Sequence, residues 1–383
     1  MKRGISLIII LLLYSCKQNP DTDTTPTNTS EIGLENTITY ANGFRIRHVE
    51  GYTEVDVLKP WTNSEQEFHY VFIPDSIQSQ VLIDSSAYDA IVTTPVKSIV
   101  VTSTTHIPVL EALGVENLLQ GFPDTRYISS PKTATLVKEG VITELGINEA
   151  INTEVLVALD PDVVVGFSIN NQNRTYDKIA HAGIPVVYNG DWVEEHPLGK
   201  AEWIRFFGVI FEKEALADSL FNSITENYNA AVKLATLAHE TPTVMSGAMF
   251  KDIWYLPAGK SWAAQFFKDA NADYLWAETA GSGSLSLNFE SVLATGRNAD
   301  YWIGTAGFTS YADLDGMNNH YKEFDAYKNR RTFTFSKVKG EGGGVLYYEL
   351  APNRPDLVLK DLIRVLHPDL LEAYEPVFIK PLD

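Results

Sequence analysis

The fold is decided by a stretch that places a helix, a sharp break and a buried strand in direct succession: Asn152-Thr-Glu-Val-Leu-Val-Ala-Leu-Asp-Pro-Asp-Val-Val-Val-Gly-Phe167. Asn152 is a favourable N-cap, because its side-chain oxygen can accept a hydrogen bond from a free N–H of the first turn. The apolar spacing predicts a helix through Leu159, and Asp160-Pro161 ends it because proline cannot continue a helix. Val163–Val165 then indicates a strand that is buried on both faces, as in a parallel sheet covered by helices.

The same alternation of strand and helix continues on both sides of this stretch. Upstream we expect the elements Ile99–Val101, Pro108–Leu113 and Leu119–Phe122, and downstream Tyr176–Ala182 and Pro185–Tyr188. A second series comprises Thr243–Ser246, Trp262–Lys268, Tyr301–Ile303, Thr332–Phe335 and Pro355–Leu366. Strands that alternate with helices of this length predict an α/β fold with doubly wound parallel sheets.

A long helical segment separates the two series. Leu198–Phe211 has the pattern of an amphipathic helix, and Glu214–Ala238 holds no Gly or Pro and repeats apolar residues at helical spacing. At 1.5 Å per residue the second helix would be about 37 Å long, enough to connect two lobes. Before the first series, Phe44–Val49, Glu54–Leu58 and Phe68–Ile73 alternate as antiparallel strands do. We therefore predict two Rossmann-like lobes joined by a single long helix, with a small N-terminal β elaboration.

The N-terminus has the pattern of a secretion signal. Lys2 and Arg3 precede the apolar run Ile5–Leu13, which is too short to span a bilayer of about 30 Å. Cys16, the only cysteine in the chain, follows directly and resembles the lipidated cysteine of a bacterial lipobox. An ordinary signal peptide is the alternative, because Tyr14 is bulkier than the residue usual at its position.

These patterns give the predicted organisation of the chain. We expect a lipoprotein signal peptide at 1–15, a flexible tether at 16–37, a first lobe at 38–200, a helical linker at 201–240 and a second lobe at 241–383. The tether is rich in Thr, Asp, Asn and Pro and cannot bury enough apolar surface to fold. The protein would then work in the periplasm or cell envelope, anchored to a membrane through lipid on Cys16.

Composition narrows the function further. The formal net charge of −19 argues against nucleic acid and anionic lipid surfaces as partners. A single cysteine excludes a disulfide framework within the chain. No nucleophile with an adjacent acid–base pair is visible, so we do not expect an enzyme, although an extracytoplasmic hydrolase is kept as a distant alternative.

Three segments together resemble the helix-linked class of periplasmic substrate-binding proteins, which serve ABC importers of iron–siderophores, haem and vitamin B12. They are Val96–Gly114 with Leu119–Phe122, the stretch Asn152–Phe167 quoted above, and Ser286–Leu293 with Asn298–Ile303. The resemblance implies a monomeric receptor that captures a metal chelate, most simply a ferric siderophore, and has no cofactor of its own. Cobalamin or haem, and a free Zn or Mn ion held through His106, are the alternatives.

The resemblance also implies contacts with an ABC permease. Glu154 and Glu290 fall where members of this class present a glutamate on each lobe to arginines of the permease. The alternative is that each carboxylate only complements the dipole of its own helix, worth about 0.3–1 kcal/mol.

We expect the ligand between the lobes, where the carboxyl ends of the parallel strands meet. The candidate ligand-binding residues follow predicted strands or carry flat apolar or cationic groups: Thr104, Thr105, His106, Phe122, Arg126, Phe167, Arg174, Trp192, Trp254, Tyr255 and Ser284. For each aromatic residue the alternative is packing in a core, and for Arg126 and Arg174 it is simple solvation.

Overall fold

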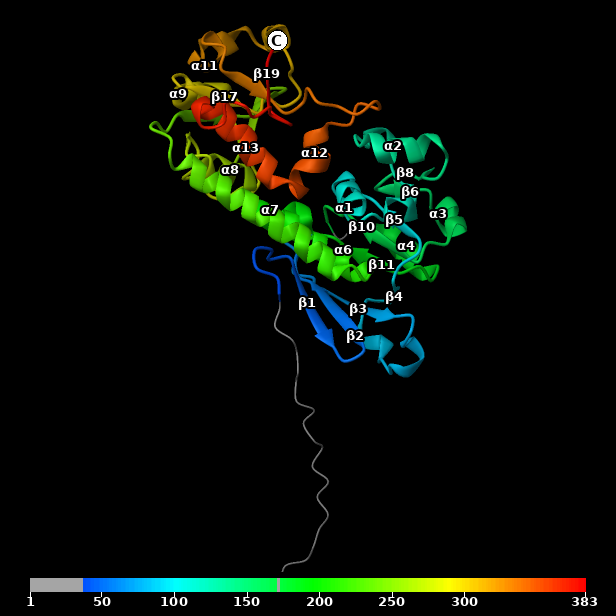
Figure 1. Ribbon diagram of the computed structural model, residues 1–383. Helices are drawn as coiled ribbons and strands as arrows, with labels where there is room; N and C mark the ends of the chain where they lie inside the picture. The colour runs from blue at the N-terminus through cyan, green and yellow to red at the C-terminus, as the bar shows by residue number, and fades with distance from the viewer. Residues whose placement is uncertain (1–36, 171–172) are drawn as a thin grey trace, which may run out of the picture. The chain divides into compact units, whose positions relative to one another are not determined.

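The structure is a computed structural model that describes residues 37–170 and 173–383 (Figure 1). The predicted signal peptide, Cys16 and nearly all of the predicted tether lie outside the described residues. Within them, no helix is both long and apolar enough to span a bilayer.

The first lobe is built on a five-stranded parallel sheet of order β11-β10-β5-β6-β7. Its strands are β5 (Ile99–Val101), β6 (Leu119–Phe122), β7 (Thr143–Glu144), β10 (Val163–Gly166) and β11 (Val186–Tyr188). Its helices are α1 (Ile107–Ala112), α2 (Pro131–Lys138), α3 (Thr153–Leu159) and α4 (Arg174–His181), with a small hairpin of β8 (Gly146–Ile147) and β9 (Ala150–Ile151).

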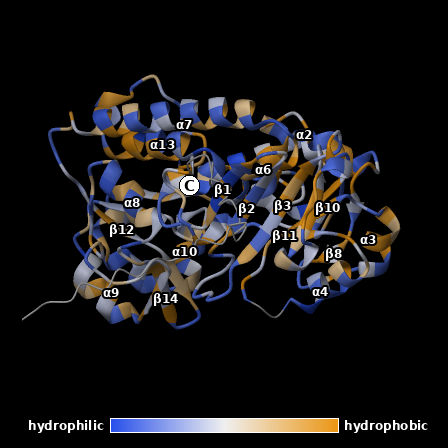
Figure 2. Ribbon diagram, turned by 90° about the horizontal axis from the view of Figure 1, so that it is seen from below, coloured by the Kyte–Doolittle hydropathy of each residue, from blue (hydrophilic) through white to orange (hydrophobic). Residues whose placement is uncertain are grey.

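The stretch 152–167 forms the predicted helix, break and strand. Asn152 caps α3 by accepting a hydrogen bond from the Val155 N–H at 3.2 Å, and the helix ends at Asp160, whose φ is +48°. Along β10, Val163 and Val165 join the core on one face of the sheet, while Val164 joins the core on the other. Both faces are therefore covered, which explains why the strand is uniformly apolar (Figure 2).

The second lobe repeats the design with a sheet of order β15-β12-β17-β18-β19. Its strands are β12 (Thr243–Ser246), β15 (Asp273–Tyr274), β17 (Tyr301–Ile303), β18 (Thr332–Thr334) and β19 (Lys380–Pro381), of which only β19 pairs antiparallel. A smaller antiparallel sheet joins β13 (Ala248–Phe250), β14 (Ile253–Pro257) and β16 (Ser284–Leu287). The helices are α8 (Trp262–Asp269), α9 (Phe289–Gly296), α10 (Tyr311–Met317), α11 (Asp325–Lys328), α12 (Leu346–Leu350) and α13 (Pro355–Leu366).

Helix α7 (Glu214–Ala235) connects the two lobes. Ala217 and Phe221, near its start, are buried in the core of the first lobe, whereas Tyr228 and Ala231 are buried in the core of the second. The helix lies alongside α6 (Ile204–Ile210) at one end and α13 at the other (Figure 1). One continuous helix is thus anchored in both cores, as predicted, although it ends three residues before the expected Ala238.

The predicted helix over Leu198–Phe211 is wrong in two respects. It divides at Trp203 into α5 (Pro197–Glu202) and α6, and every residue of α5 is buried, so α5 is not amphipathic. The Trp203 indole packs on Phe44 at 4.3 Å and donates to the Glu194 carboxylate at 3.1 Å. These tertiary contacts place a turn where the sequence pattern alone favours a continuous helix.

An N-terminal four-stranded sheet of order β1-β2-β3-β4 packs against α6. The strands are β1 (Phe44–Val49), β2 (Tyr52–Val57), β3 (Phe68–Pro74) and β4 (Ala90–Thr94). The first three pair antiparallel as predicted, whereas β4, which the sequence analysis did not predict, pairs parallel to β3.

Candidate functional site

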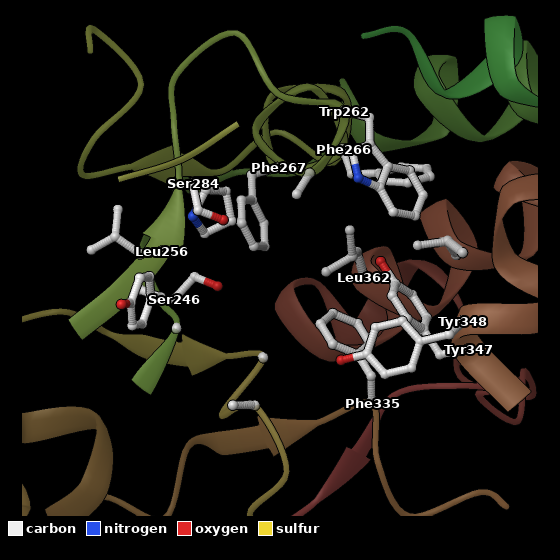
Figure 3. Close-up of a pocket in the computed structure, with 17 residues that line it drawn as sticks. Ser246, Leu256, Trp262, Phe266, Phe267, Ser284, Phe335, Tyr347, Tyr348 and Leu362 are labelled. Atoms are coloured by element: carbon white, nitrogen blue, oxygen red, sulfur yellow. The ribbon is translucent and has the colours of Figure 1, made fainter. Parts of the chain in front are cut away.

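The carboxyl edge of the second sheet lines a pocket. Ser246 ends β12, Gly304 follows β17 and Phe335 follows β18, and because these strands are parallel all three lie at the same edge. They line a pocket of about 370 Å³ (Figure 3). Open α/β sheets bind their ligands at this edge.

Aromatic side chains form much of the wall of this pocket, which we call the aromatic pocket. Figure 3 shows the rings of Trp262, Phe335, Tyr347 and Tyr348 around the open space. The Phe335 and Tyr347 rings stack at 4.1 Å, and Trp262 stacks on Tyr347 at 6.0 Å. Rings held in this way offer a large, rigid apolar surface to a ligand.

The aromatic pocket carries no formal charge at neutral pH. Its remaining lining residues are Gly247, Tyr255, Leu256, Pro257, Ala263, Phe266, Phe267, Ser284, Ala306, Val358 and Leu362, none of which is acidic or basic. Burial raises the pKa of the Tyr347 and Tyr348 phenols, so both hydroxyls stay protonated. A neutral, apolar ligand surface therefore fits this pocket best.

A second cavity, of about 260 Å³, extends the aromatic pocket toward the first lobe. It shares Trp262 and Ser284 with the aromatic pocket, and Trp192 and Val193 form its other side. We call it the middle cavity. It joins residues of both lobes in one cleft.

The carboxyl edge of the first sheet supplies that other side. Trp192 follows β11 and meets Phe167, which follows β10, in an edge-to-face contact at 5.7 Å. The Lys200 ammonium donates to the carbonyls of Asp191 and Trp192, both at 2.9 Å, and lies 5.0 Å from the Trp262 ring centre. Burial lowers the pKa of Lys200 to about 8, although the nearby carboxylates of Asp191 and Glu194 oppose the shift.

His106 belongs to the turn after β5 and lines none of the described cavities. It is 1 % exposed, and neither ring nitrogen has a hydrogen-bond partner within the described residues. Burial lowers the pKa of His106 to about 4 against the opposing field of Asp191, so the ring is neutral at physiological pH. Over residues 37–170 and 173–383, no group of three or more His, Cys, Asp or Glu side chains could hold a metal ion.

The cleft contains some of the predicted ligand-binding residues. Trp192, Tyr255 and Ser284 line its cavities. Thr104, Thr105 and Phe167 line none of the described cavities. Thr104 and Thr105 form a half-buried turn after β5, where the Thr105 carbonyl accepts a hydrogen bond from the Asn353 amide at 2.8 Å. That hydrogen bond joins the two lobes directly.

Other predicted residues lie elsewhere. Phe122 is 2 % exposed in the core of the first lobe, and Trp254 is fully buried among Trp302 and other rings of the second lobe. Packing in a core, the alternative for each aromatic residue, therefore describes both. Arg126 and Arg174 are exposed and line none of the five cavities described for this chain.

Most residues of the aromatic pocket are not among the predicted ligand-binding residues. Phe335 and Trp262 were expected only as the end of a strand and the start of a helix. Tyr347 and Tyr348 follow the glycine-rich loop 340–344, and that loop was the signal that could have identified them. Chain segments that return to a strand edge after such a loop are candidates for the ligand site.

The two glutamates of the predicted permease contact occupy matching positions. Glu154 lies in the first turn of α3 and Glu290 in the first turn of α9, and Asn152 and Asn288 cap these helices. Both side chains are exposed, and neither forms an ion pair with another described residue.

Comparison with known proteins identifies the fold and the family. Residues 99–338 match the family model described as "Periplasmic binding protein". An uncharacterized lipoprotein of Methanocaldococcus jannaschii is 24% identical over 299 residues, which cover 75% of this chain and 69% of that protein.

Solved structures share the arrangement of the lobes. A periplasmic haem-binding protein from Pseudomonas aeruginosa superimposes with a TM-score of 0.57 at 15% identity, covering 75% of this chain and 98% of that one. A possible iron-binding periplasmic protein from Staphylococcus epidermidis gives 0.55 at 18% identity, covering 72% and 100%. Because the family model spans more than half of the sequence, the chain belongs to the periplasmic binding protein family and is a binding protein, not an enzyme.

Proposed function

We propose that this protein is a lipid-anchored, extracytoplasmic receptor that captures the metal complex of a bulky organic ligand and delivers it to an ABC import permease. The single observation that carries the proposal is the aromatic pocket at the carboxyl edge of the second sheet. Rings and neutral hydroxyls suit the organic surface of a chelate, whereas a bare metal ion needs a cluster of charged or imidazole ligands.

The polarity and charge of the residues that line the cleft favour some ligands over others. A ferric siderophore, haem and a corrinoid all present large organic surfaces, and solved relatives of this fold include proteins named for iron, haem and vitamin B12. The aromatic pocket offers no cation to a highly anionic chelate, because Arg126 and Arg174 lie outside it. This supports a neutral ferric chelate or a macrocycle over a polyanionic siderophore.

The proposed lipid anchor and extracytoplasmic location are supported by other observations than the pocket. The relative in M. jannaschii is named a lipoprotein, and Cys16 follows the predicted signal segment of this chain. We propose that lipid on Cys16 holds the receptor at a membrane. Mass spectrometry of the mature N-terminus tests this, because acylation would add the mass of the lipid to a chain that begins at residue 16.

Ligand capture can be tested by titration. Trp262 and Trp192 line the cleft, so a bound chromophore should quench tryptophan fluorescence. We expect saturable quenching by at least one of ferric chelates, haemin and cyanocobalamin. Saturable binding of free Zn²⁺ or Mn²⁺ with none of these complexes would contradict the proposal.

Delivery can be tested separately. Glu154→Arg and Glu290→Arg should leave ligand affinity within about twofold of wild type and abolish uptake in cells, since a reversed charge would face the permease arginines. Glu149→Arg, an exposed change that precedes α3, is the matched control and should leave uptake unchanged. Normal uptake by both charge-reversal variants would remove Glu154 and Glu290 from the docking surface.

A further inference from the structure

The N-terminal sheet contributes a loop to the ligand cleft. The loop 59–64 connects β2 with β3 and therefore lies outside residues 99–338, which match the family model. Thr62 of this loop lines the middle cavity together with Trp192 and Ser282. The cleft consequently has a third wall that belongs to neither Rossmann-like lobe.

Close packing holds the loop in place. Trp61 is 7 % exposed and meets Tyr188, at the end of β11, edge to face at 5.5 Å. A Cβ on Gly190 would approach the Lys59 carbonyl oxygen to 2.3 Å, so only glycine permits this contact. The loop is therefore seated on the same segment that carries Trp192.

Residues of the loop also line a third cavity, of about 280 Å³. It shares Thr62, Val193, Glu194 and Ser282 with the middle cavity, which in turn shares Trp262 and Ser284 with the aromatic pocket. We call it the polar cavity. Because each cavity shares lining residues with the next, the three are neighbours in a row from the second lobe to the N-terminal sheet.

The polar cavity differs in chemistry from the aromatic pocket. The side chains of Thr62, Asn63 and Ser282 are exposed and form no hydrogen bond with other described residues, so they are free to bind a ligand. Its charged lining residues are one lysine, Lys59, and the carboxyl groups of Glu194 and Glu195. A polyanion would thus meet more negative than positive charge here.

The Glu194 carboxylate is bound by hydrogen bonds within the protein. Its carboxylate accepts hydrogen bonds from the backbone N–H groups of Asn42 and Gly43, at 3.0 and 2.8 Å, and from the Trp203 indole at 3.1 Å. The exposed Glu195 lines the polar cavity and forms no ion pair within the described chain.

We infer that the loop 59–64 forms a specificity subsite for an uncharged, amide- or hydroxyl-bearing part of the ligand, whose apolar metal-carrying part occupies the aromatic pocket. This inference rests on the proposed function. Hydroxyl and amide side chains recognise neutral amides and hydroxyls through paired hydrogen bonds, whereas the carboxylates disfavour an acidic appendage.

Two probes of opposite chemistry test the subsite. Cyanocobalamin carries uncharged amides around its macrocycle, and haemin carries two carboxylates. We expect the wild-type protein to bind cyanocobalamin at least tenfold more tightly than haemin at neutral pH. A preference for haemin would overturn the assignment of the polar cavity to neutral groups.

Variants of exposed residues separate the subsite from the rest of the groove. Thr62→Trp should weaken cyanocobalamin binding at least tenfold by filling the middle and polar cavities, and Glu195→Lys should reduce the preference over haemin at least threefold. The matched control is Glu65→Lys, because Glu65 is exposed and lines none of the described cavities. Thermal melting should give wild-type midpoints for all three variants.

The outcomes distinguish this inference from the proposed function. Suppose that the wild-type protein binds a metal complex, and that Thr62→Trp and Glu195→Lys bind both probes with wild-type affinity. The subsite is then wrong, and the proposed receptor function stands. If the wild-type protein binds neither probe nor any ferric chelate, the proposed function fails and the subsite with it.

Discussion

The carboxyl edges of the two sheets face the same cleft, but the side chains at the two edges differ in polarity. The first edge buries titratable groups, among them His106, Asp191 and Lys200, and leaves several of their polar atoms without a partner in the described structure. The second edge holds the aromatic pocket, which lacks charge. The same strand–helix unit thus carries buried polar groups in one lobe and lines an uncharged, largely apolar pocket in the other.

This difference assigns distinct roles to the two edges. A buried polar atom without a partner costs about 1–3 kcal/mol, so we expect the polar groups of the first edge to lower the stability of its lobe. Its Lys200 nevertheless holds the Trp192 carbonyl and faces the Trp262 ring, and so positions both tryptophans beside the middle cavity. Changes at the second edge should therefore affect binding, and changes at the first should affect stability and its pH dependence.

The largest effect is expected from blocking the second edge. Ser284 is exposed on β16 and lines both the aromatic pocket and the middle cavity. Ser284→Trp should fill them and weaken binding of the metal complex at least a thousandfold, about 4 kcal/mol. Ser286→Trp, two residues along the same strand and outside the described cavities, is the control, and fluorescence titration is the measurement. Near-normal affinity of Ser284→Trp would show that the ligand binds elsewhere.

A smaller effect, on stability, is expected at the first edge. The folded-state pKa of His106 is about 4, below its ordinary value of 6.5, so the unfolded chain binds the proton more tightly between these values. The associated stability is present above pH 6.5 and is lost as the pH falls toward 4, up to about 3 kcal/mol.

Urea unfolding at several pH values can measure this contribution. His106→Leu should remove it, so the stability difference between variant and wild type should change by up to about 3 kcal/mol between pH 7 and pH 4. Other acidic groups are common to both proteins and cancel in the difference. Parallel curves over this range would mean that His106 is not buried as a neutral ring.

The comparison also shows what the sequence could predict. Local signals sufficed for the elements: Asn152 as a cap, Asp160-Pro161 as a break and Val163–Val165 as a strand buried on both faces. They failed for Leu198–Phe211, because the division at Trp203 comes from contacts with distant residues. The family followed from three such local motifs, which explains why it was predictable.

The side chains that line the pocket were harder to predict, because burial is a tertiary property. Trp254 and Tyr255 were both expected in the cleft, yet β14 alternates, so Trp254 enters the core while Tyr255 is 40% exposed and lines the aromatic pocket. Period-two alternation excludes one of two adjacent strand residues from a given face, but the sequence alone does not indicate which. Trp262 and Tyr347 reach the pocket only because α8 and α12 pack together around it.

The smallest effect is expected for a half-buried hydrogen bond that joins the two lobes. The Asn353 amide of the second lobe donates to the Thr105 carbonyl after β5 at 2.8 Å. Asn353→Ala should cost about 1 kcal/mol of folding free energy, the net value of a hydrogen bond of this kind, because the carbonyl is only half-buried and water can replace the amide. Asn329→Ala, an exposed change at the end of α11, is the control and should stay within about 0.5 kcal/mol of wild type. Urea unfolding measures both, and a cost above about 3 kcal/mol for Asn353→Ala would mean that water does not replace the amide at the Thr105 carbonyl.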